Sequence, residues 1–327
     1  MRHNSLFIAG LCLAYSCTAS AQHSVLADSI VKYQMPSGGW AKNQDWLRGP
    51  DVQYMNRCFS TGVGSTIDNG ATTSEMKVLA QAYAETHDER YREAFVRGLR
   101  YLFAMQYANG GFPQFYPVRK AAAYSSHITF NDCAMTNVMR LLRDVAEDRD
   151  LYAPLQLPKS LRRQAGKSFR KAVGCILKCQ IRKDGRLTVW CQQHDEHTLA
   201  PAPARAFELA SYTGHGETVD IILLLREIKN PSKAVRAAID GAVEWLKQHA
   251  IHDMEVERFT NSDGKPDIRL VRREGAPLLW ARYYDLDNAE PFFCDRDGQP
   301  RKRLEDIGYE RRNGYSWLGT SPQKVIE

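Results

Sequence analysis

The sequence has no hydrophobic run long enough to cross a membrane. Its N-terminal apolar stretch runs only from Leu6 to Ala14, well short of the roughly 20 residues that a membrane-spanning helix requires. A basic start precedes this stretch and Ala19-Ser20-Ala21 follows it, which is the order of parts in a cleaved export signal. We therefore predict that residues 1–21 are a signal peptide. We also predict that residues 22–327 form one large domain that is exported, to the periplasm or out of the cell, without a membrane span.

The sequence also lacks the features of a nucleic-acid-binding protein. Its 44 lysines and arginines are scattered among 38 acidic residues and leave a formal net charge of +6. Neither a zinc-finger spacing nor the aromatic motif of an RNA-recognition domain is present. The modest positive excess is compatible with a polyanionic partner other than nucleic acid.

The sequence contains eight cysteines, and it does not fix their oxidation state. An oxidising compartment would allow pairing, and Cys175, Cys179 and Cys191 are close enough in sequence for a local bridge or a metal site. Buried free thiols in a large core fit the pattern equally well. The cysteines that follow the predicted signal peptide are Cys58, Cys133, Cys175, Cys179, Cys191 and Cys294.

Three similar segments recur along the chain. Each begins at a glutamine, continues through a glycine turn and leads to an aromatic residue; they are Gln34–Trp40, Gln106–Phe112 and Gln180–Trp190. Recurrence at such a long interval indicates a repeat whose unit is larger than one helix. The aromatic side chains could stack on a ligand, but aromatic residues beside glycine turns more often fill the end of a core.

Amphipathic helices fill the intervals between these segments. Apolar residues recur from Met76 to Tyr83 at the spacing of one helix face. Thr72 and Glu75 form a capping-box pattern just before them. Asp88 provides an N-cap for a second helix that follows almost at once. The first interval therefore predicts a pair of helices.

Two further helix pairs follow the same scheme. Apolar residues recur on one helix face over residues 135–145 and 161–176. A third pair is predicted over residues 203–229 and after Ser232, the N-cap of the last helix. Three helix pairs can bury their apolar faces against one another. We therefore predict an all-α fold, an (α/α)3 toroid of three helix hairpins, with an irregular C-terminal extension from about Asp253.

Two acidic, amide-bearing segments precede the first helices of the first and second pairs. Asp68 and Asn69 belong to one segment, and Asn131 and Asp132 belong to the other. Because the segments occupy matching places in their repeats, the two carboxylates could face one cleft. Carboxylate and amide oxygens there would suit a hard cation such as Ca²⁺. The same residue types also cap helices and form turns, and spacing alone does not decide between these roles.

Other polar motifs are weaker. Arg205 lies at the head of a predicted helix between small and apolar residues, where an ion pair with Glu208 or with a neighbouring helix would explain it. The run His194-Asp195-Glu196-His197 resembles a metal cluster but lacks the H-E-x-x-H pattern of zinc enzymes. The run Asp295-Arg296-Asp297-Gly298 matches only part of a calcium loop, so a turn is the simpler interpretation.

Taken together, these residues resemble the pectate lyases of polysaccharide lyase family 10. The resemblance extends through nearly the whole mature chain, and its specificity comes from the shared order and spacing of short motifs. The motifs are GGWAKN (38–43), TIDNGATT (66–73), GGFPQ (110–114), ITFND (128–132), WCQQHD (190–195), PARAFE (203–208), RYYD (282–285), FCDRDG (293–298) and ERRNGYSW (310–317).

The resemblance implies a fold, an activity and a set of site residues. The fold is the (α/α)3 toroid, and residues 22–327 would be the catalytic domain of a monomeric pectate lyase. The activity is calcium-assisted β-elimination on polygalacturonate, the α-1,4-galacturonan of pectin, which yields 4,5-unsaturated oligogalacturonides. The resemblance places Ca²⁺ on Asp68 and Asp132, makes Arg205 the base, and assigns substrate binding to Asn69, Thr73, Arg282 and Arg296.

The chemistry of β-elimination agrees with these roles. The reaction removes the proton at C5, next to the uronate carboxylate, so a cation and guanidinium groups on that carboxylate would stabilise the developing charge. Arginine also orients a carboxylate by binding it through two hydrogen bonds. A free guanidinium has a pKa above about 12, so Arg205 can serve as the base only through its environment or in an alkaline medium.

Two other functions fit the same residues. An inverting glycoside hydrolase would use Asp68 and Asp132 as its acid and base and would need no metal. A non-catalytic uronate-binding protein would keep the cleft without turnover. The products separate the three functions. A lyase leaves an unsaturated uronide that absorbs near-ultraviolet light, a hydrolase leaves only a reducing end, and a binding protein leaves neither.

Overall fold

Strands form a larger part of the fold than the sequence predicts. The structure, a computed structural model, describes residues 24–120 and 122–327. It is 45% helical and 14% strand, with the strands arranged in several sheets. The prediction of an all-α fold, and with it the (α/α)3 toroid, is therefore wrong. The predicted signal peptide, residues 1–21, lies outside the described residues.

The chain divides into two compact units. Unit 1 contains the residues up to 106 together with 115–119 and 137–169. Unit 2 contains residues 107–114, 120–136 and 170–327. Among the described residues, strands β1 to β12 all belong to unit 2, so the strand content that the sequence analysis missed is confined to that unit.

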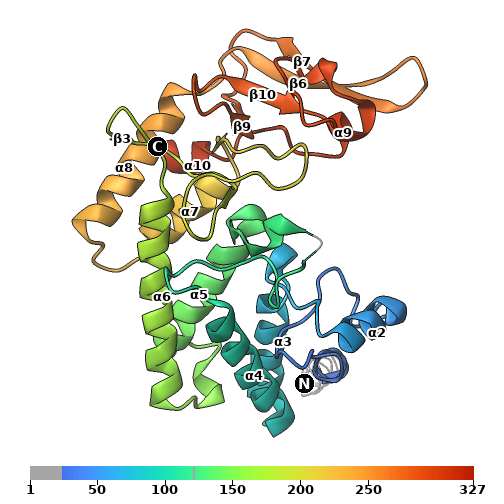
Figure 1. The fold of residues 1–327 in the computed structure, drawn as a ribbon, viewed down its shortest axis with the longest axis vertical. Coiled ribbons are helices and arrows are strands. Elements are labelled where there is room, and N and C mark those ends of the chain that lie inside the picture. The colour runs from blue at the N-terminus through green and yellow to red at the C-terminus, as the bar shows by residue number, and fades with distance from the viewer. Residues whose placement is uncertain (1–23, 121) are drawn as a thin grey trace, which may run out of the picture. The chain divides into compact units, whose positions relative to one another are not determined.

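The helices of all three predicted pairs are present, but the first helix of the third pair begins later than predicted. They are α3 (Thr73–Thr86) with α4 (Glu89–Met105), α5 (Ala134–Ala146) with α6 (Lys159–Cys179), and α7 (Glu217–Arg226) with α8 (Lys233–Gln248). Helix α3 contacts α4, and α7 contacts α8 (Figure 1). The N-caps predicted at Asp88 and Ser232 are confirmed, because each side chain accepts a hydrogen bond from a backbone N–H of the first turn.

The capping box predicted at Thr72 and Glu75 does not form. Thr72 has a φ of 65° and makes no side-chain cap. Its Oγ1 instead donates to the carbonyl of Thr66 at 2.8 Å and accepts from the N–H of Trp40 at 3.1 Å. Glu75 accepts from Trp46 Nε1 at 2.7 Å. Thr72 therefore ties the start of α3 to the extended segments before it.

The third pair begins later than the sequence indicates. Residues 203–216 form turns and the short strand β5 (Tyr212–Thr213), and helix α7 begins only at Glu217. Pro203 supplies no backbone N–H and disfavours helical geometry in the residue before it. Arg205 is consequently a loop residue, and its predicted place at the head of a helix is wrong.

Unit 1 is built mainly from helices around a buried core. It contains α2 (Val52–Thr61), the 3₁₀ turns η1 (Asp68–Gly70) and η4 (Ala153–Leu155), and the pair α3 and α4. A Cβ added at Gly98 of α4 would lie 2.9 Å from Sδ of Met76 on α3. The absence of a side chain at Gly98 therefore lets the two helices pack closely.

Unit 2 combines a small sheet with a long hairpin. The antiparallel sheet has the order β11 (Pro300–Arg301), β10 (Pro291–Cys294), β9 (Tyr283–Tyr284) and β5, and the hairpin consists of β6 (Met254–Thr260) and β7 (Pro266–Arg272). Shorter pairs join β1 (Ile128–Thr129) to β4 (Gln193–His194), β2 (Arg182–Lys183) to β3 (Arg186–Leu187), and β8 (Trp280–Ala281) to β12 (Leu318–Gly319). The remaining elements are η2 (Ala123–Ser126), η3 (Asn131–Cys133), η5 (Leu304–Asp306), α9 (Tyr309–Asn313) and α10 (Gln323–Ile326).

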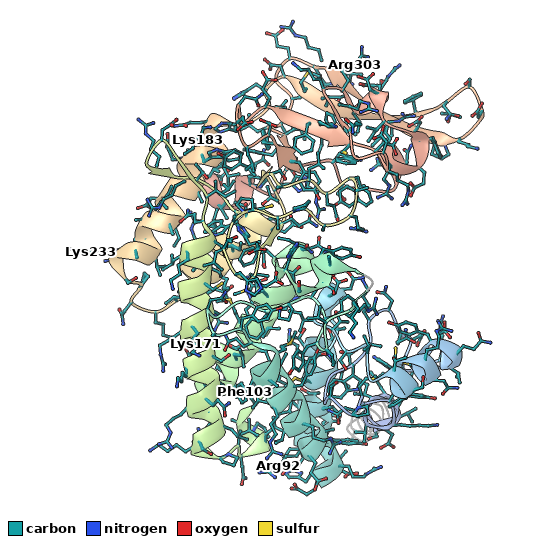
Figure 2. The ribbon with its side chains drawn as sticks, in the orientation of Figure 1. Arg92, Phe103, Lys171, Lys183, Lys233 and Arg303 are labelled. Carbon is teal, nitrogen blue, oxygen red and sulfur yellow. The ribbon has the colours of Figure 1, made fainter. Side chains whose placement is uncertain are left out.

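The region from Asp253 onward is ordered, so the predicted irregular extension is wrong. Figure 1 shows its strands and α9 gathered in one part of unit 2. Charged side chains such as Lys183, Lys233 and Arg303 lie at the surface of the unit (Figure 2). No described helix is long and apolar enough to span a membrane. The buried cluster at the centre of this region consists of Phe207, Tyr283, Phe292, Phe293, Cys294, Leu304, Ile307 and Trp317.

The aromatic residues of the three repeated segments fill the core, as the sequence predicts. Trp40, Phe112 and Trp190 are fully buried. Their carbonyls accept hydrogen bonds from the backbone N–H groups of Thr66, Thr129 and Thr213, respectively, at 2.9–3.1 Å. Each repeated turn is therefore joined by a backbone hydrogen bond to a short segment that lies later in the chain.

A fourth copy of the turn exists that the sequence does not reveal. In the first copy the N–H of Met35 donates to the carbonyl of Gly39, and the indole of Trp40 donates to the carbonyl of Ile30. In the fourth copy the N–H of Ile251 donates to the carbonyl of Leu279, and the indole of Trp280 donates to the carbonyl of Leu246. The hairpin β6–β7 lies between Ile251 and Leu279, so it is an elaboration of this turn.

Candidate active site

Two short turns carry the predicted calcium ligands. Asp68 and Asn69 lie in η1 of unit 1, and Asn131 and Asp132 lie in η3 of unit 2. Asn69 and Asp132 both have φ 51° and ψ 33°, a left-handed conformation that asparagine and aspartate tolerate better than most residues. The local backbones therefore match, but the acid and the amide are exchanged. Asp68 corresponds to Asn131, and Asn69 corresponds to Asp132.

Asp68 carries a carboxylate oxygen that lacks a hydrogen-bond donor. The side chain is buried, and its Oδ2 forms an ion pair with Nζ of Lys42. Its Oδ1 is buried and has no hydrogen-bond partner among the described residues. A buried polar atom without a partner is costly, and a cation would supply the missing interaction. The donor set around Asp68 therefore fits a metal ligand.

The other predicted residues of unit 1 lie beside Asp68. Asn69 is exposed, and its amide donates to Oδ1 of Asn43 at 2.9 Å. Thr73 is buried, and its Oγ1 donates to the carbonyl of Gly70 at 3.0 Å. The short turn η1 and the first turn of α3 therefore bring Asp68, Asn69 and Thr73 together.

Asp132 lies at the end of a hydrogen-bonded network in unit 2. Its carboxylate is exposed and accepts from Nδ2 of Asn131 at 2.8 Å. Asn131 is buried, and its Oδ1 accepts from Nε2 of Gln192 and from Nη2 of Arg282. Asp132 is thereby linked through one amide to an arginine that the sequence assigns to substrate binding.

Arg205 is held by Glu208 through several hydrogen bonds. Its Nε donates to Oε2 of Glu208 at 2.7 Å, its Nη2 donates to Oε1, and its backbone N–H donates to Oε2 at 3.1 Å. These bonds raise the pKa of Arg205 above its ordinary value, although burial opposes the shift. The arginine side chain remains 46% exposed, so its guanidinium is both fixed and accessible.

Glu208 connects Arg205 to the rest of the network. It is buried and also accepts from the hydroxyl of Tyr315 at 2.9 Å and from Nε2 of Gln192 at 3.2 Å. Burial alone would raise the pKa of Glu208, but the hydrogen bonds and charge of Arg205 outweigh it and lower that pKa. The hydroxyl of Tyr283 bonds to both Tyr315 and Gln192. Arg205 and Asp132 therefore belong to one continuous network.

Arg282 is largely buried beside a buried carboxylate. Its side chain is 11% exposed and forms an ion pair with Glu217, and its guanidinium lies 4.7 Å from the ring centroid of Tyr315. Burial opposes the charge of Arg282, but Glu217 raises its pKa. Burial raises the pKa of Glu217, against the effect of Arg282, and its Oε2 has no hydrogen-bond partner among the described residues.

Arg296 lies near Arg205 but is held more loosely. It is exposed and donates to both carboxylate oxygens of Glu310 at 3.1 Å. The guanidinium groups of Arg205 and Arg296 lie 4.8 and 5.9 Å from the ring centroid of Phe207. Phe207 therefore provides a common surface for the two cations.

A cavity of about 540 Å³ opens beside this network in unit 2. Asp132 and Arg282 line it, together with Tyr315 and residues of the hairpin β6–β7. Carboxylate, guanidinium and hydroxyl groups thus meet at one polar pocket. Bidentate guanidinium groups bind carboxylates well, so the pocket is suited to an acidic ligand.

Most of the residues that hold these arginines in place carry no signal in the sequence. Gln192 and Tyr283 lie inside the motifs WCQQHD and RYYD, yet nothing in those motifs predicts their mutual hydrogen bond. Glu217 gave no signal, because it lies inside residues 203–229, which the sequence predicts to be helical. Glu208 was considered only as an ion-pair partner of Arg205, which is the contact that the structure shows.

A separate group of possible metal ligands lies elsewhere in unit 2. His127, Asp195 and Glu196 each offer one ligand atom, and these atoms lie within 4.8 Å of one another. In the sequence, His194 and His197 flank the same two acids. His194 is instead buried, with Nδ1 on the carbonyl of Leu199 and Nε2 accepting from the N–H of Cys191. His194 therefore has no ring nitrogen left for a metal.

Solved structures of a polysaccharide lyase resemble this chain. Two structures of the family 10 polysaccharide lyase from Cellvibrio cellulosa each give a TM-score of 0.78 at 32% sequence identity. The alignments cover 92% of this chain and 90% and 89% of the respective lyase chains. One of the two is an aspartate-to-alanine variant in complex with trigalacturonic acid. The fold is therefore that of a polysaccharide lyase.

The family itself follows from the sequence comparison. A family model described as pectic acid lyase matches residues 34–326, and the chain belongs to this family. The resemblance to pectate lyases is thus confirmed, and the chain is a pectate lyase. The comparison with curated proteins gives no match.

Proposed function

We propose that this pectate lyase cleaves polygalacturonate by calcium-assisted β-elimination and releases 4,5-unsaturated oligogalacturonides. The observation that carries the proposal is the network in unit 2 that connects Arg205, Arg282 and Asp132 beside one cavity. Fixed guanidinium groups suit a polymer that carries one carboxylate on each sugar. The complex of the Cellvibrio lyase with trigalacturonic acid supports the same class of substrate.

Arg282 and Arg296 are proposed to bind substrate carboxylates, with Asn69 and Thr73 as further contacts. Arg282 is held by Glu217 and Asn131 before substrate arrives, so little side-chain entropy is lost on binding. Arg296 is exposed and must exchange its bonds to Glu310 for bonds to substrate, so its contribution is smaller. We expect Arg282 to govern orientation at the reacting sugar.

Asp68 and Asp132 are proposed as calcium ligands. Oδ1 of Asp68 is buried without a partner, and Asp132 presents an exposed carboxylate, which agrees with the preference of Ca²⁺ for oxygen ligands. When bound, the ion would stabilise the negative charge that develops on the uronate during proton removal. Lys42 neutralises the other oxygen of Asp68 and orients its carboxyl group.

Arg205 is proposed as the residue that takes the proton from C5. Its guanidinium is fixed by Glu208 and is still half-exposed, as a group that must meet substrate requires. The same hydrogen bonds raise its pKa, so the uncharged form is rare at neutral pH. Because its fraction grows about tenfold with each pH unit below that pKa, we expect alkaline conditions to favour the reaction.

Product analysis tests the proposed reaction. The purified chain is mixed with polygalacturonate in the presence of Ca²⁺, and near-ultraviolet absorbance and reducing ends are followed together. β-Elimination produces one unsaturated end for each reducing end. Reducing ends without the chromophore would show hydrolysis and would refute the proposal.

We also propose that residues 1–21 direct export, and that residues 22–327 form the catalytic domain of a monomer in the periplasm or the medium. The order of basic start, apolar stretch and Ala-Ser-Ala supports this proposal, and the family match begins only at residue 34. N-terminal sequencing of the exported protein should begin at Gln22, and size-exclusion chromatography should give the mass of one chain. An N-terminus that retains the first residues would contradict the export signal.

A further inference from the structure

The hairpin β6–β7 contributes to the wall of the cavity that contains Asp132 and Arg282. It is inserted into the fourth repeated turn, between Ile251 and Leu279. Figure 1 shows β6 and β7 beside β10 and α9 within unit 2. From this hairpin the cavity receives Val256, Arg258 and Ile268. The hairpin inserted into this turn thus adds a second arginine, besides Arg282, to the cavity.

Arg258 is the cation of this hairpin that faces the cavity. Its side chain is exposed, and no hydrogen bond or ion pair joins it to another side chain among the described residues. Its acidic neighbours on β6 are engaged elsewhere, since Glu255 pairs with Arg273 and Glu257 pairs with Arg269. Neither of these two glutamates therefore pairs with Arg258, and the carboxylate in the same cavity is that of Asp132.

We infer that Arg258 binds a second uronate carboxylate of the substrate and is the residue of this hairpin that distinguishes unesterified from methyl-esterified sugars. The inference rests on the proposed function, because it concerns the same cavity. Arg258 lines the same pocket as Arg282. Arg282 is already paired with Glu217, whereas Arg258 has no ion pair among the described residues and can bind a substrate carboxylate. A polymer with a carboxylate on each sugar supplies one anion to each arginine.

The chemistry of esterification makes the inference specific. A methyl ester removes the negative charge and one of the two acceptor oxygens that a guanidinium binds. Arg258 would therefore lose its partner wherever the sugar opposite it is esterified. This role affects substrate binding and not proton removal, because Arg258 is not a member of the network that holds Arg205.

The test compares Arg258→Gln with Arg272→Gln, a matched control. Arg272 is an exposed arginine on β7 of the same hairpin and does not line the cavity. KM and kcat are measured on polygalacturonate and on pectins of rising methyl esterification. We expect Arg258→Gln to raise KM on polygalacturonate about tenfold with little change in kcat, as for the loss of one charge-assisted contact. The increase in KM caused by Arg258→Gln should become smaller as methyl esterification rises. Arg272→Gln should have the KM and kcat of the wild type on every substrate.

Two results would overturn the inference. One is a KM for Arg258→Gln equal to that of the control. The other is a penalty of the same size at every degree of esterification, which would indicate a structural effect. Affinity electrophoresis of the same variants in gels containing polygalacturonate measures binding without turnover. A wild-type chain that binds but does not cleave would therefore count against the proposed reaction, while the comparison of Arg258→Gln with the control would still decide the role of Arg258.

Discussion

At the scale of single residues, the free protein holds Arg205 as a guanidinium cation. Glu208 is buried, receives three hydrogen bonds from Arg205 and raises the pKa of that residue. Glu208 thus has two opposing effects on Arg205. It fixes the guanidinium in place, and at the same time it makes the uncharged form less abundant.

Replacing Glu208 should separate these two effects. Glu208→Gln removes the negative charge, so the pKa of Arg205 should fall and the alkaline rise of kcat should move to lower pH. The pH profile of kcat at saturating substrate measures this shift. Glu310→Gln is the control, because Glu310 pairs with Arg296 and Arg311 and not with Arg205. Identical profiles for Glu208→Gln and the wild type would show that Arg205 does not set the rise.

Asp68 gives a second prediction at this scale. Asp68→Asn keeps the shape of the side chain but removes its charge, so calcium binding should weaken by about 10–100-fold or more, given that even residues outside the ligand shell have effects of this size. Calcium titrations of activity and of heat release measure the change. Asp45→Asn is the control, because Asp45 is an exposed turn residue. An unchanged calcium requirement in Asp68→Asn would remove Asp68 from the site.

At the scale of elements, the repeated turn explains which parts of the fold the sequence could reveal. Three copies keep a glutamine, a glycine turn and an aromatic residue, and all three were found. The fourth was hidden because the hairpin β6–β7 separates Ile251 from Leu279. The hairpin itself gave little periodic signal, because both of its strands are partly exposed and their burial does not alternate cleanly.

Thr72 joins the repeated turn of unit 1 to helix α3 through two buried hydrogen bonds. Thr72→Val keeps the side-chain shape but loses both bonds, so the free energy of unfolding should fall by about 1–3 kcal/mol. Thr72→Ser retains the hydroxyl and should lose less. Urea denaturation of the two variants measures the difference. Equal stabilities would show that the hydroxyl does not tie the turn to the helix.

At the scale of the whole molecule, the sequence predicted the family and the helix pairs but not the fold class. Matching motifs along nearly the whole chain identified a pectate lyase, and helix periodicity located the pairs. The short strands escaped, since two-residue strands such as β5 and β9 carry no alternating pattern. Contacts such as Gln192 with Asn131 and Tyr283 with Tyr315 join segments far apart in sequence, and no local pattern encodes them.

The state of the cysteines is another feature that the sequence alone could not establish. The sequence left open whether they pair, form a metal site or remain free. In the structure none of the six described cysteines forms a disulfide, and all except Cys133 are buried. Cys175 and Cys179 face each other with 3.8 Å between their sulfur atoms. The packing of unit 2 thus places these two thiols together, and sequence spacing alone could not establish their state.

The central claim is that Arg205 takes the C5 proton of galacturonate, and the most direct test measures turnover and substrate affinity separately for Arg205→Ala and Arg205→Lys. Loss of a positioned base lowers rates by roughly 10²–10⁴-fold. The account predicts a loss of at least this size in kcat for Arg205→Ala, with polygalacturonate binding largely retained. Lysine should not restore turnover, because it lacks the planar guanidinium. Near-normal turnover of Arg205→Ala at saturating substrate would contradict the account.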